Sequence, residues 1–379
     1  MSTPAPIHGH VASGFEPVRE AFEANFADRG EIGAAFALMR ENDVLVDLRG
    51  GYADRKKSRA WGEETIVPVF STGKAVTALV IAWLVDQGRL AYDAPVAEVW
   101  PDFAQAGKAG VTLAQALSHQ AGLPGYDREM DPSDWFDRET MEARFAAMAP
   151  LWPLGEGSGY HPISYGVIAD AVVRRADAKG RTVGAILREE ICGPRGIDFH
   201  IGVAEADHDR AAEHVLPPRA PNLGKINREK EIAFLKPWSS PGRRGAAAWR
   251  SAELPAANGH GAARAIARLM APFASGGKLD GEAFVSPEAI REAMQQRVSG
   301  EDRVLPFDLA FAAGVMINRG SRAFGPEPVA VGHYGFGGSC GFADPERGLS
   351  GAYVMNRQMD VLVGDERAKA LIEAAYGCL

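Results

Sequence analysis

Residues 71–85 read STGKAVTALVIAWLV, and this stretch decides which fold and which chemistry the chain can have. Ser71 and Lys74 form an S-x-x-K tetrad, and residues 75–85 carry no charge. An apolar run of this length predicts a helix that is buried on nearly every side and ends near Gly88. Positions i and i+3 share one face of a helix, so we expect the Lys74 amine beside the Ser71 hydroxyl at the helix N-terminus.

The Ser71–Lys74 pair predicts a nucleophile next to its base. A serine hydroxyl attacks poorly until a neighbouring group takes its proton, and a lysine does this at neutral pH only when burial or nearby positive charge lowers its pKa. The apolar helix and the positive end of its dipole supply both conditions. For the tetrad taken by itself, the alternative to a catalytic role is a chance occurrence of the motif. A phosphate-binding loop is excluded, because Pro68 and Ala75 stand where that motif needs a glycine and a hydroxyl residue.

Composition and charge limit the classes of partner. The chain has 379 residues, of which 46% are hydrophobic and 24% charged, so it can bury a large core as a soluble globular protein. Its net charge of -8 argues against nucleic acid or an anionic membrane as the main partner, since both favour clustered lysine and arginine. A small-molecule substrate is therefore expected, and nothing indicates the oligomeric state.

Cysteine usage and the N-terminal sequence predict a cytoplasmic location. Cys192, Cys340 and Cys378 are too few and too scattered for a disulfide framework or a zinc site. Residues 1–17 lack the basic and apolar regions of a secretory signal, and no apolar stretch reaches membrane-spanning length. The histidines form no metal-binding pattern, and residues 8–10 are expected in a solvated terminal tail. We expect neither a metal nor a cofactor.

The hydrophobic pattern predicts strands near both ends of the chain and helices between them. The expected strands cover residues 32–39, 44–50, 309–317, 329–332 and 350–355, and the expected terminal helices cover 17–27 and 365–376. Strands so far apart in sequence join most simply in one antiparallel sheet with the terminal helices packed on it. The predicted fold class is α+β or α/β.

We expect two interleaved domains. Residues 1–73 and 231–379 form the predicted sheet domain, and residues 74–230 form a mostly helical domain with several prolines. Residues 216–254 are rich in Pro, Gly, Arg and Lys and are long for an idle connection, so they either rim the site or form a mobile surface loop.

Two other places have the residue types that could assist Ser71. The glycine-rich residues 155–162 deliver Tyr160 just before a predicted helix, where its hydroxyl could relay a proton, although a loop-packing aromatic is the alternative. Residues 331–338 read VGHYGFGG, a strand that runs into a glycine cluster. Glycines allow close approach of a ligand, and a backbone N–H from this strand, paired with that of Ser71, would form an oxyanion hole.

Together the three places resemble the serine β-lactamase and penicillin-binding protein superfamily, whose motifs are S-x-x-K, Y-x-N and K-T-G. The matching residues here are 71–74, Tyr160 and His333-Tyr334-Gly335. Order and spacing are similar to the class C branch, and within it to family VIII carboxylesterases, whose third motif often has His or Trp in place of Lys. The resemblance spans nearly the whole chain. It implies a β-lactamase-like fold with the active site in a cleft between the sheet domain and the helical domain.

The resemblance also implies roles for individual residues. Ser71 would be the acylated nucleophile, while Lys74 and Tyr160 would share the general acid and base work. The backbone N–H groups of Ser71 and Phe336 would hold the oxyanion. Substrate contacts are expected from the third motif, His333, Tyr334 and Gly335.

Tyr126 follows the sequence Leu-Pro-Gly at 123–125 and is expected to line the same pocket, with simple packing as the alternative.

Two departures from the family pattern favour esters over β-lactams. Pro162 replaces the asparagine of Y-x-N and has no amide side chain to orient a substrate amide. His333 replaces the lysine of K-T-G, so a fixed cation becomes a group that is mostly neutral at pH 7. We therefore expect a serine carboxylesterase that acts on small esters with short acyl chains. The alternatives are a β-lactamase, a D-amino-acid peptidase or an acyltransferase of the same fold, or a binding protein that has lost catalysis.

A second serine motif is expected to be a decoy. Residues 337–341 read GGSCG and match the G-x-S-x-G nucleophile elbow around Ser339, which requires a helix after the serine. The residues that follow, 342–345, predict a turn, and no histidine follows His333 to serve as a base.

Overall fold

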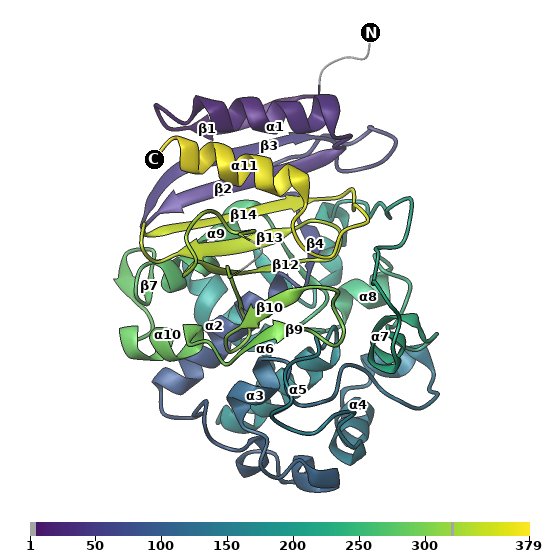
Figure 1. Ribbon diagram of the computed structural model, residues 1–379. Helices are drawn as coiled ribbons and strands as arrows, with labels where there is room; N and C mark the ends of the chain where they lie inside the picture. The colour runs from purple at the N-terminus through teal and green to yellow at the C-terminus, as the bar shows by residue number, and fades with distance from the viewer. Residues whose placement is uncertain (1–4, 320–321) are drawn as a thin grey trace.

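A large antiparallel sheet organises the chain in the computed structural model, which describes residues 5–319 and 322–379 (Figure 1). Within these residues the sheet has nine strands. In spatial order they are β1 (Ile7–Val11), β3 (Asp43–Gly51), β2 (Gly33–Arg40), β14 (Leu349–Met355), β13 (Cys340–Asp344), β12 (Val331–Tyr334), β11 (Met316–Ile317), β10 (Asp308–Phe311) and β9 (Val298–Glu301). Strands from the two ends of the chain meet where β2 pairs with β14, with Ala37 opposite Ala352.

Both faces of this sheet are covered by helices, which explains why its central strands β12, β13 and β14 are buried along their whole length. The terminal helices α1 (Glu16–Asp28) and α11 (Glu366–Gly377) lie side by side on one face, and α9 (Ala263–Ala274) packs on the other (Figure 1). Along β2, Phe36 and Leu38 join the core under the terminal helices, while alternate residues face α9. The expected antiparallel sheet with flanking terminal helices is confirmed.

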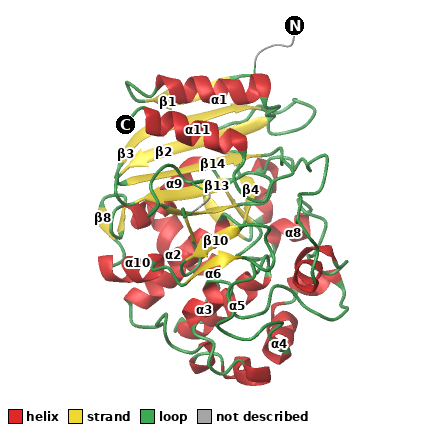
Figure 2. Cartoon of the chain, viewed as in Figure 1, coloured by secondary structure: helices red, strands yellow, loops and turns green. Residues whose placement is uncertain are grey.

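The remaining helices gather at the end of the molecule away from α1 and α11 (Figure 2). They are α2 (Gly73–Asp86), α3 (Leu113–Leu117), α4 (Arg138–Ala147), α5 (Ser164–Ala176), α6 (Val183–Ile186), α7 (Arg228–Lys230), α8 (Ala247–Ser251) and α10 (Pro287–Met294), with short 3-10 and π turns between them. A small sheet joins β4 (Val67–Phe70), β6 (Gly259–Gly261) and β5 (Phe199–Ile201), and β7 (Lys278–Leu279) pairs with β8 (Glu282–Ala283).

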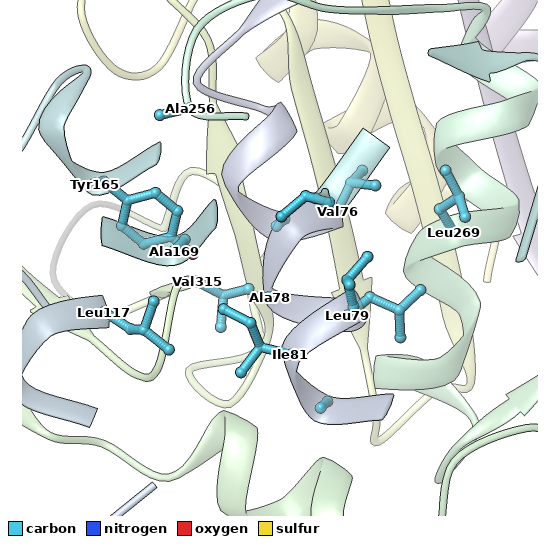
Figure 3. Close-up of a cluster of buried hydrophobic side chains, with 14 of the residues drawn as sticks. Val76, Ala78, Leu79, Ile81, Leu117, Tyr165, Ala169, Ala256, Leu269 and Val315 are labelled. Atoms are coloured by element: carbon cyan, nitrogen blue, oxygen red, sulfur yellow. The ribbon is translucent and has the colours of Figure 1, made fainter. Parts of the chain in front are cut away.

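Helix α2 is the buried helix that its apolar sequence predicts. Its side chains lie among those of Leu117, Tyr165, Leu269 and Val315 (Figure 3). The helix ends where expected, because Gly88 adopts a left-handed conformation (φ +66°) and its N–H donates to the carbonyl of Val85. At the other end, the helix begins at Gly73, so Ser71 lies in the turn just before it.

Three local predictions are wrong. Residues 309–317 form a hairpin of β10 and β11 rather than one strand, because the chain turns at Gly314, whose φ is +95°. Residues 8–10 belong to β1, an edge strand paired with β3, rather than to a loose tail. Residues 342–344, expected in a turn, continue β13, which is still not the helix that a nucleophile elbow requires.

The division into residues 1–73 with 231–379 and residues 74–230 stays a prediction. Strand β5 belongs to the second segment by sequence but pairs with β6 of the first. The two segments also share one large apolar core that includes residues of α2, α5 and α9. Within the described part of the chain, no helix combines the length and apolar character needed to span a bilayer.

Candidate active site

Ser71 is presented to a cavity by a strained turn. Strand β4 ends at Phe70, a non-glycine residue in the left-handed region (φ +49°), and the chain then enters α2. The Phe70 ring is held by Trp249, His214 and Phe336, with ring centroids 5.9, 5.2 and 6.0 Å away. Ser71 thereby lines a cavity of about 490 Å³.

Lys74 lies directly under Ser71 and is fully enclosed. Its Nζ atom is 3.0 Å from the Ser71 Oγ atom, 2.8 Å from the carbonyl oxygen of Pro162 and 3.1 Å from the carbonyl oxygen of Ala256. The side chain has no solvent exposure, and this burial lowers the pKa of Lys74 well below its ordinary value. No carboxylate within the described residues forms an ion pair with the amine.

Burial favours the neutral form of the Lys74 amine, and the three contacts are compatible with that form. A neutral lysine has two N–H groups and one lone pair. The carbonyl oxygens of Pro162 and Ala256 can only accept, so they take both N–H groups, and the lone pair is left for the proton of the Ser71 hydroxyl. The site is thus arranged for proton transfer from serine to lysine.

Tyr160 completes a group of three with Ser71 and Lys74. Its ring lies over the Lys74 Nζ atom, 4.8 Å from centroid to nitrogen, and its side chain lines the same cavity as Ser71. Burial raises the pKa of Tyr160, so the group is a phenol at neutral pH. The structure therefore brings together the three residues that the sequence motifs single out.

Asp302 holds the tyrosine loop and was missed from the sequence. Its carboxylate accepts hydrogen bonds from the N–H of Tyr160 at 2.9 Å and from the Ser158 hydroxyl at 2.8 Å. It also accepts from the N–H groups of Val304 and Leu305. Because 142 residues separate it from Tyr160, no local pattern indicates this contact.

Buried histidines surround the reactive group. His161 donates from Nδ1 to the carbonyl of Gly159 and accepts at Nε2 from the N–H of Leu123. His119 accepts at Nδ1 from the N–H of His161, and its ring lies 4.7 Å from that of Tyr160. The sequence motifs assign no role to His119.

His333 lines the cavity as a neutral group. Its Nδ1 lies 2.8 Å from the carbonyl oxygen of Tyr334, which can only accept, so Nδ1 carries the proton. Its Nε2 atom is therefore an acceptor, and it is buried without a protein partner within the described residues. Burial lowers the pKa of His333 to about 3, so no fixed cation stands at this position.

Two cavity-lining residues have backbone N–H groups without a protein partner in the described part of the chain. Within residues 5–319 and 322–379, neither the N–H of Ser71 nor that of Phe336 donates a hydrogen bond to a protein group. Both residues line the cavity. The Phe336 peptide is held by Gln358, whose Nε2 donates to its carbonyl at 2.6 Å. Such a pair of free donors has the character of an oxyanion hole.

Two of the residues that the sequence predicts for the pocket, Tyr126 and Tyr334, do not offer their polar groups to a substrate. Tyr126 does not line the cavity, because its ring packs near Phe145 (centroids 6.3 Å apart) and Arg144. The Tyr334 hydroxyl points away from any substrate, since it donates to the carbonyl of Ala323 at 2.7 Å.

Gly335 and Ser339 support the site from behind. The N–H of Gly335 donates to the Ser339 carbonyl, and a β-carbon there would lie 2.1 Å from the Ser339 Oγ and 2.2 Å from the Val69 carbonyl oxygen. Gly335 therefore serves close packing rather than substrate contact. Ser339 is fully buried, and its hydroxyl donates to the carbonyl of Val69 at 2.8 Å and meets that of Thr72 at 3.1 Å.

Residues 216–254 contribute much of the cavity wall. The lining residues from this segment include Leu223, Phe234, Leu235, Arg244 and Trp249. The sequence left two interpretations of this segment open, and the structure favours the rim of the site over a surface loop without a role in the site. Most of the lining side chains are apolar, so the cavity suits a substrate with an apolar body.

An S-x-x-K tetrad at the start of a buried helix, facing a tyrosine and the edge of an antiparallel sheet, defines the class of serine β-lactamase-like proteins. The chain belongs to the beta-lactamase family, whose sequence model matches residues 18–376. The family resemblance inferred from the three motifs is confirmed.

Individual relatives support the same assignment. The chain is 35% identical to the esterase/beta-lactamase LipL of Mycobacterium tuberculosis over 96% of its own length and 86% of that protein. The crystal structure of a penicillin-binding protein homologue from Caulobacter crescentus is 54% identical, with a TM-score of 0.96 and 99% and 100% of the two chains covered. The crystal structure of a family VIII carboxylesterase is 38% identical, with a TM-score of 0.93 and the same coverage.

Proposed function

We propose that this protein is a serine carboxylesterase that hydrolyses esters with short acyl chains through an acyl-enzyme intermediate. The observation that carries the proposal is the enclosed Lys74 amine, whose two N–H groups are taken by carbonyl oxygens and whose third contact is the Ser71 hydroxyl at 3.0 Å. The similarity to proteins named esterase and family VIII carboxylesterase supports an ester as the substrate.

In the acylation step, Lys74 takes the proton of the Ser71 hydroxyl while Oγ attacks the ester carbonyl carbon. The carbonyl oxygen becomes an oxyanion between the N–H groups of Ser71 and Phe336. When the tetrahedral intermediate collapses, the bond to the alcohol oxygen breaks. The alcohol oxygen takes a proton from the Tyr160 hydroxyl, which is resupplied by the Lys74 ammonium.

In the deacylation step, a water molecule attacks the Ser71 ester carbonyl from the same cavity. The neutral Lys74 and Tyr160 group removes a proton from this water, and the same oxyanion position holds the second tetrahedral intermediate. Breakdown returns the proton to Ser71 Oγ and releases the carboxylic acid. No cofactor enters either step, and no metal ion takes part.

A β-lactamase, peptidase or acyltransferase activity is the second candidate, since one relative is named esterase/beta-lactamase and another penicillin-binding protein homologue. Two features weigh against β-lactams as the main substrate. Pro162 lines the cavity where the family motif has an amide side chain, and His333 is neutral where the motif has a cation. Ester hydrolysis needs neither group.

We propose that the enzyme works in the cytoplasm on a small-molecule ester, without nucleic acid or membrane as a partner. The three free cysteines, two of them buried, support a reducing compartment. Separation of cell fractions followed by immunodetection tests this location, and recovery of the protein outside the cytoplasmic fraction would contradict it.

The activity is tested with aryl esters of increasing acyl chain length beside a chromogenic cephalosporin. We expect the best short-chain ester to be turned over with a kcat/KM at least about 100-fold above that of the cephalosporin, since the amide and cation contacts that favour a β-lactam are missing. Equal values for the two would overturn the esterase assignment. A kcat/KM that kept rising with chain length would contradict the short-chain preference alone.

A further inference from the structure

The charge of the cavity comes from a single side chain. Among the cavity-lining residues that the structure describes, Arg244 is the one that is charged at neutral pH, and no aspartate or glutamate lines the cavity with it. His333, the other lining residue that could carry a positive charge, is neutral. The cavity is therefore apolar over most of its wall, with one fixed cation.

Arg244 has no acidic partner. Within residues 5–319 and 322–379, no carboxylate lies within ion-pair distance of its guanidinium. Its guanidinium carbon lies over the Phe336 ring, 5.2 Å from the ring centroid. The residue is exposed, and its side chain forms part of the cavity wall. An arginine in such a place still keeps its charge.

This cation lies close to the reactive centre. Phe336, whose ring lies under the guanidinium, lines the cavity together with Ser71, and the described residues hold no partner for the backbone N–H of either. The Phe336 ring in turn contacts Phe70, the residue that precedes Ser71. A substrate whose carbonyl reached Ser71 could therefore place a second polar group against Arg244.

We propose that the preferred substrate is an ester that carries a carboxylate in addition to the scissile ester bond, and that Arg244 binds this carboxylate. The inference rests on the proposed esterase function. A guanidinium can donate two parallel N–H groups to a carboxylate, a pairing that a neutral ester cannot offer. The apolar wall would hold the body of the same molecule. Arg244 is the one charged side chain among the described residues that line the cavity, so it is the group that a substrate carboxylate there would meet.

The test compares esters that are matched except for charge. For a carboxylate on the acyl side, the mono-4-nitrophenyl ester of adipic acid is compared with 4-nitrophenyl hexanoate. For a carboxylate on the alcohol side, 4-acetoxybenzoate is compared with its methyl ester. We expect kcat/KM for the charged member to exceed that of the neutral member by about 10-fold or more in one of the pairs, the effect of one charge-assisted hydrogen-bonded contact.

Variants of Arg244 test whether this side chain causes the preference for charged esters. Arg244→Gln should reduce the charged-to-neutral ratio to about one, and Arg244→Lys should keep part of it, because the charge remains but the paired geometry is lost. The matched control is Arg243→Gln, since Arg243 is an exposed neighbour that does not line the cavity, and it should leave the ratio as in the wild type. In the wild type, raising NaCl from about 50 to 500 mM should lower the ratio through screening.

The outcomes separate the two proposals. A wild-type ratio of one or less in both pairs, or a ratio that Arg244→Gln leaves unchanged, would overturn carboxylate recognition while the esterase function stands. Absence of turnover for all four esters would overturn the esterase function itself. If Arg244→Gln does not fold, the salt dependence of the wild-type ratio decides, and a ratio that is insensitive to salt would count against the proposal.

Discussion

The Nζ atom of Lys74 lies 3.0 Å from the Oγ atom of Ser71, and the carbonyl oxygens of Pro162 and Ala256 hold it there. This arrangement links the buried helix α2 to two loops from distant parts of the chain. Burial lowers the pKa of the amine, and the two carbonyl contacts orient it toward a hydroxyl that opens into the cavity.

The first prediction separates the two candidate serines. Ser71→Ala removes the attacking atom, so ester hydrolysis should fall to background and a fluorophosphonate probe should no longer label the protein. Ser339→Ala should keep labelling and most activity, because Ser339 is fully buried behind the site and supports the backbone at Val69. Mass spectrometry of the labelled peptide checks this, and an adduct on the peptide of Ser339 alone would refute the mechanism.

The second prediction concerns the proton-transfer group. Lys74→Ala and Tyr160→Phe should each lower kcat by at least about 100-fold, the lower end of the usual loss of general acid-base help. Tyr160→Phe is the cleaner variant, because it removes one hydroxyl and keeps the ring beside His119. Steady-state kinetics and a thermal unfolding midpoint are measured together. Near-normal kcat in a folded Tyr160→Phe variant would remove Tyr160 from the mechanism.

The third prediction is the pH dependence of ester hydrolysis. Lys74 accepts a proton only when neutral, so kcat/KM should be full above its pKa and fall by about tenfold per pH unit below it. Burial lowers that pKa well below the ordinary value of 10.5. Activity should therefore be lost on the acidic side and have levelled off before pH 10. A kcat/KM that still rises steeply at pH 10 would mean that Lys74 keeps its ordinary pKa.

The fourth prediction tests the packing behind the nucleophile. Gly335→Ala should destabilise the protein by roughly 1–3 kcal/mol and lower kcat, since the new methyl group would meet the Ser339 Oγ and the Val69 carbonyl oxygen at 2.1 and 2.2 Å. Gly110→Ala is the control, because nothing lies within 4 Å of its position. Urea unfolding and ester kinetics are compared for the two variants. Equal stability of both would show that the strand end can move away from Val69.

Several features of this protein could be predicted from local sequence. The S-x-x-K spacing places Ser71 and Lys74 within one turn of each other in any helix that starts there, and the uncharged run after them forms α2. The apolar runs at both ends form β2, β3 and β14, because strands covered on both faces need apolar residues at successive positions. Tyr160 was indicated by the order of the family motifs, because it lies between the S-x-x-K tetrad and the third motif.

Other features depend on contacts that no local pattern encodes. Tyr126 was expected in the pocket from its neighbours in sequence, but Phe145 and Arg144 hold its ring elsewhere. Tyr334 lies in the third motif, yet its hydroxyl donates a hydrogen bond to the carbonyl oxygen of Ala323 and is not available to a substrate. The choice between two faces of a strand or loop depends on the partner that packs there, and in both cases that partner comes from another element.

The sequence by itself determined the Ser71–Lys74 pair and the buried helix that follows it, because periodicity and short spacing are carried locally, while the order of the three motifs indicated Tyr160 and the fold family. Only the tertiary structure decided how these residues are controlled. The partners of Lys74 at Pro162 and Ala256 lie 88 and 182 residues away, and Asp302, which holds the tyrosine loop, lies 142 residues from Tyr160. Arg244 became a candidate for substrate recognition because folding placed it, unpaired, in an apolar cavity. The pKa, orientation and charge environment of a residue come from desolvation and contacts in space, and these exist only once distant segments have packed together.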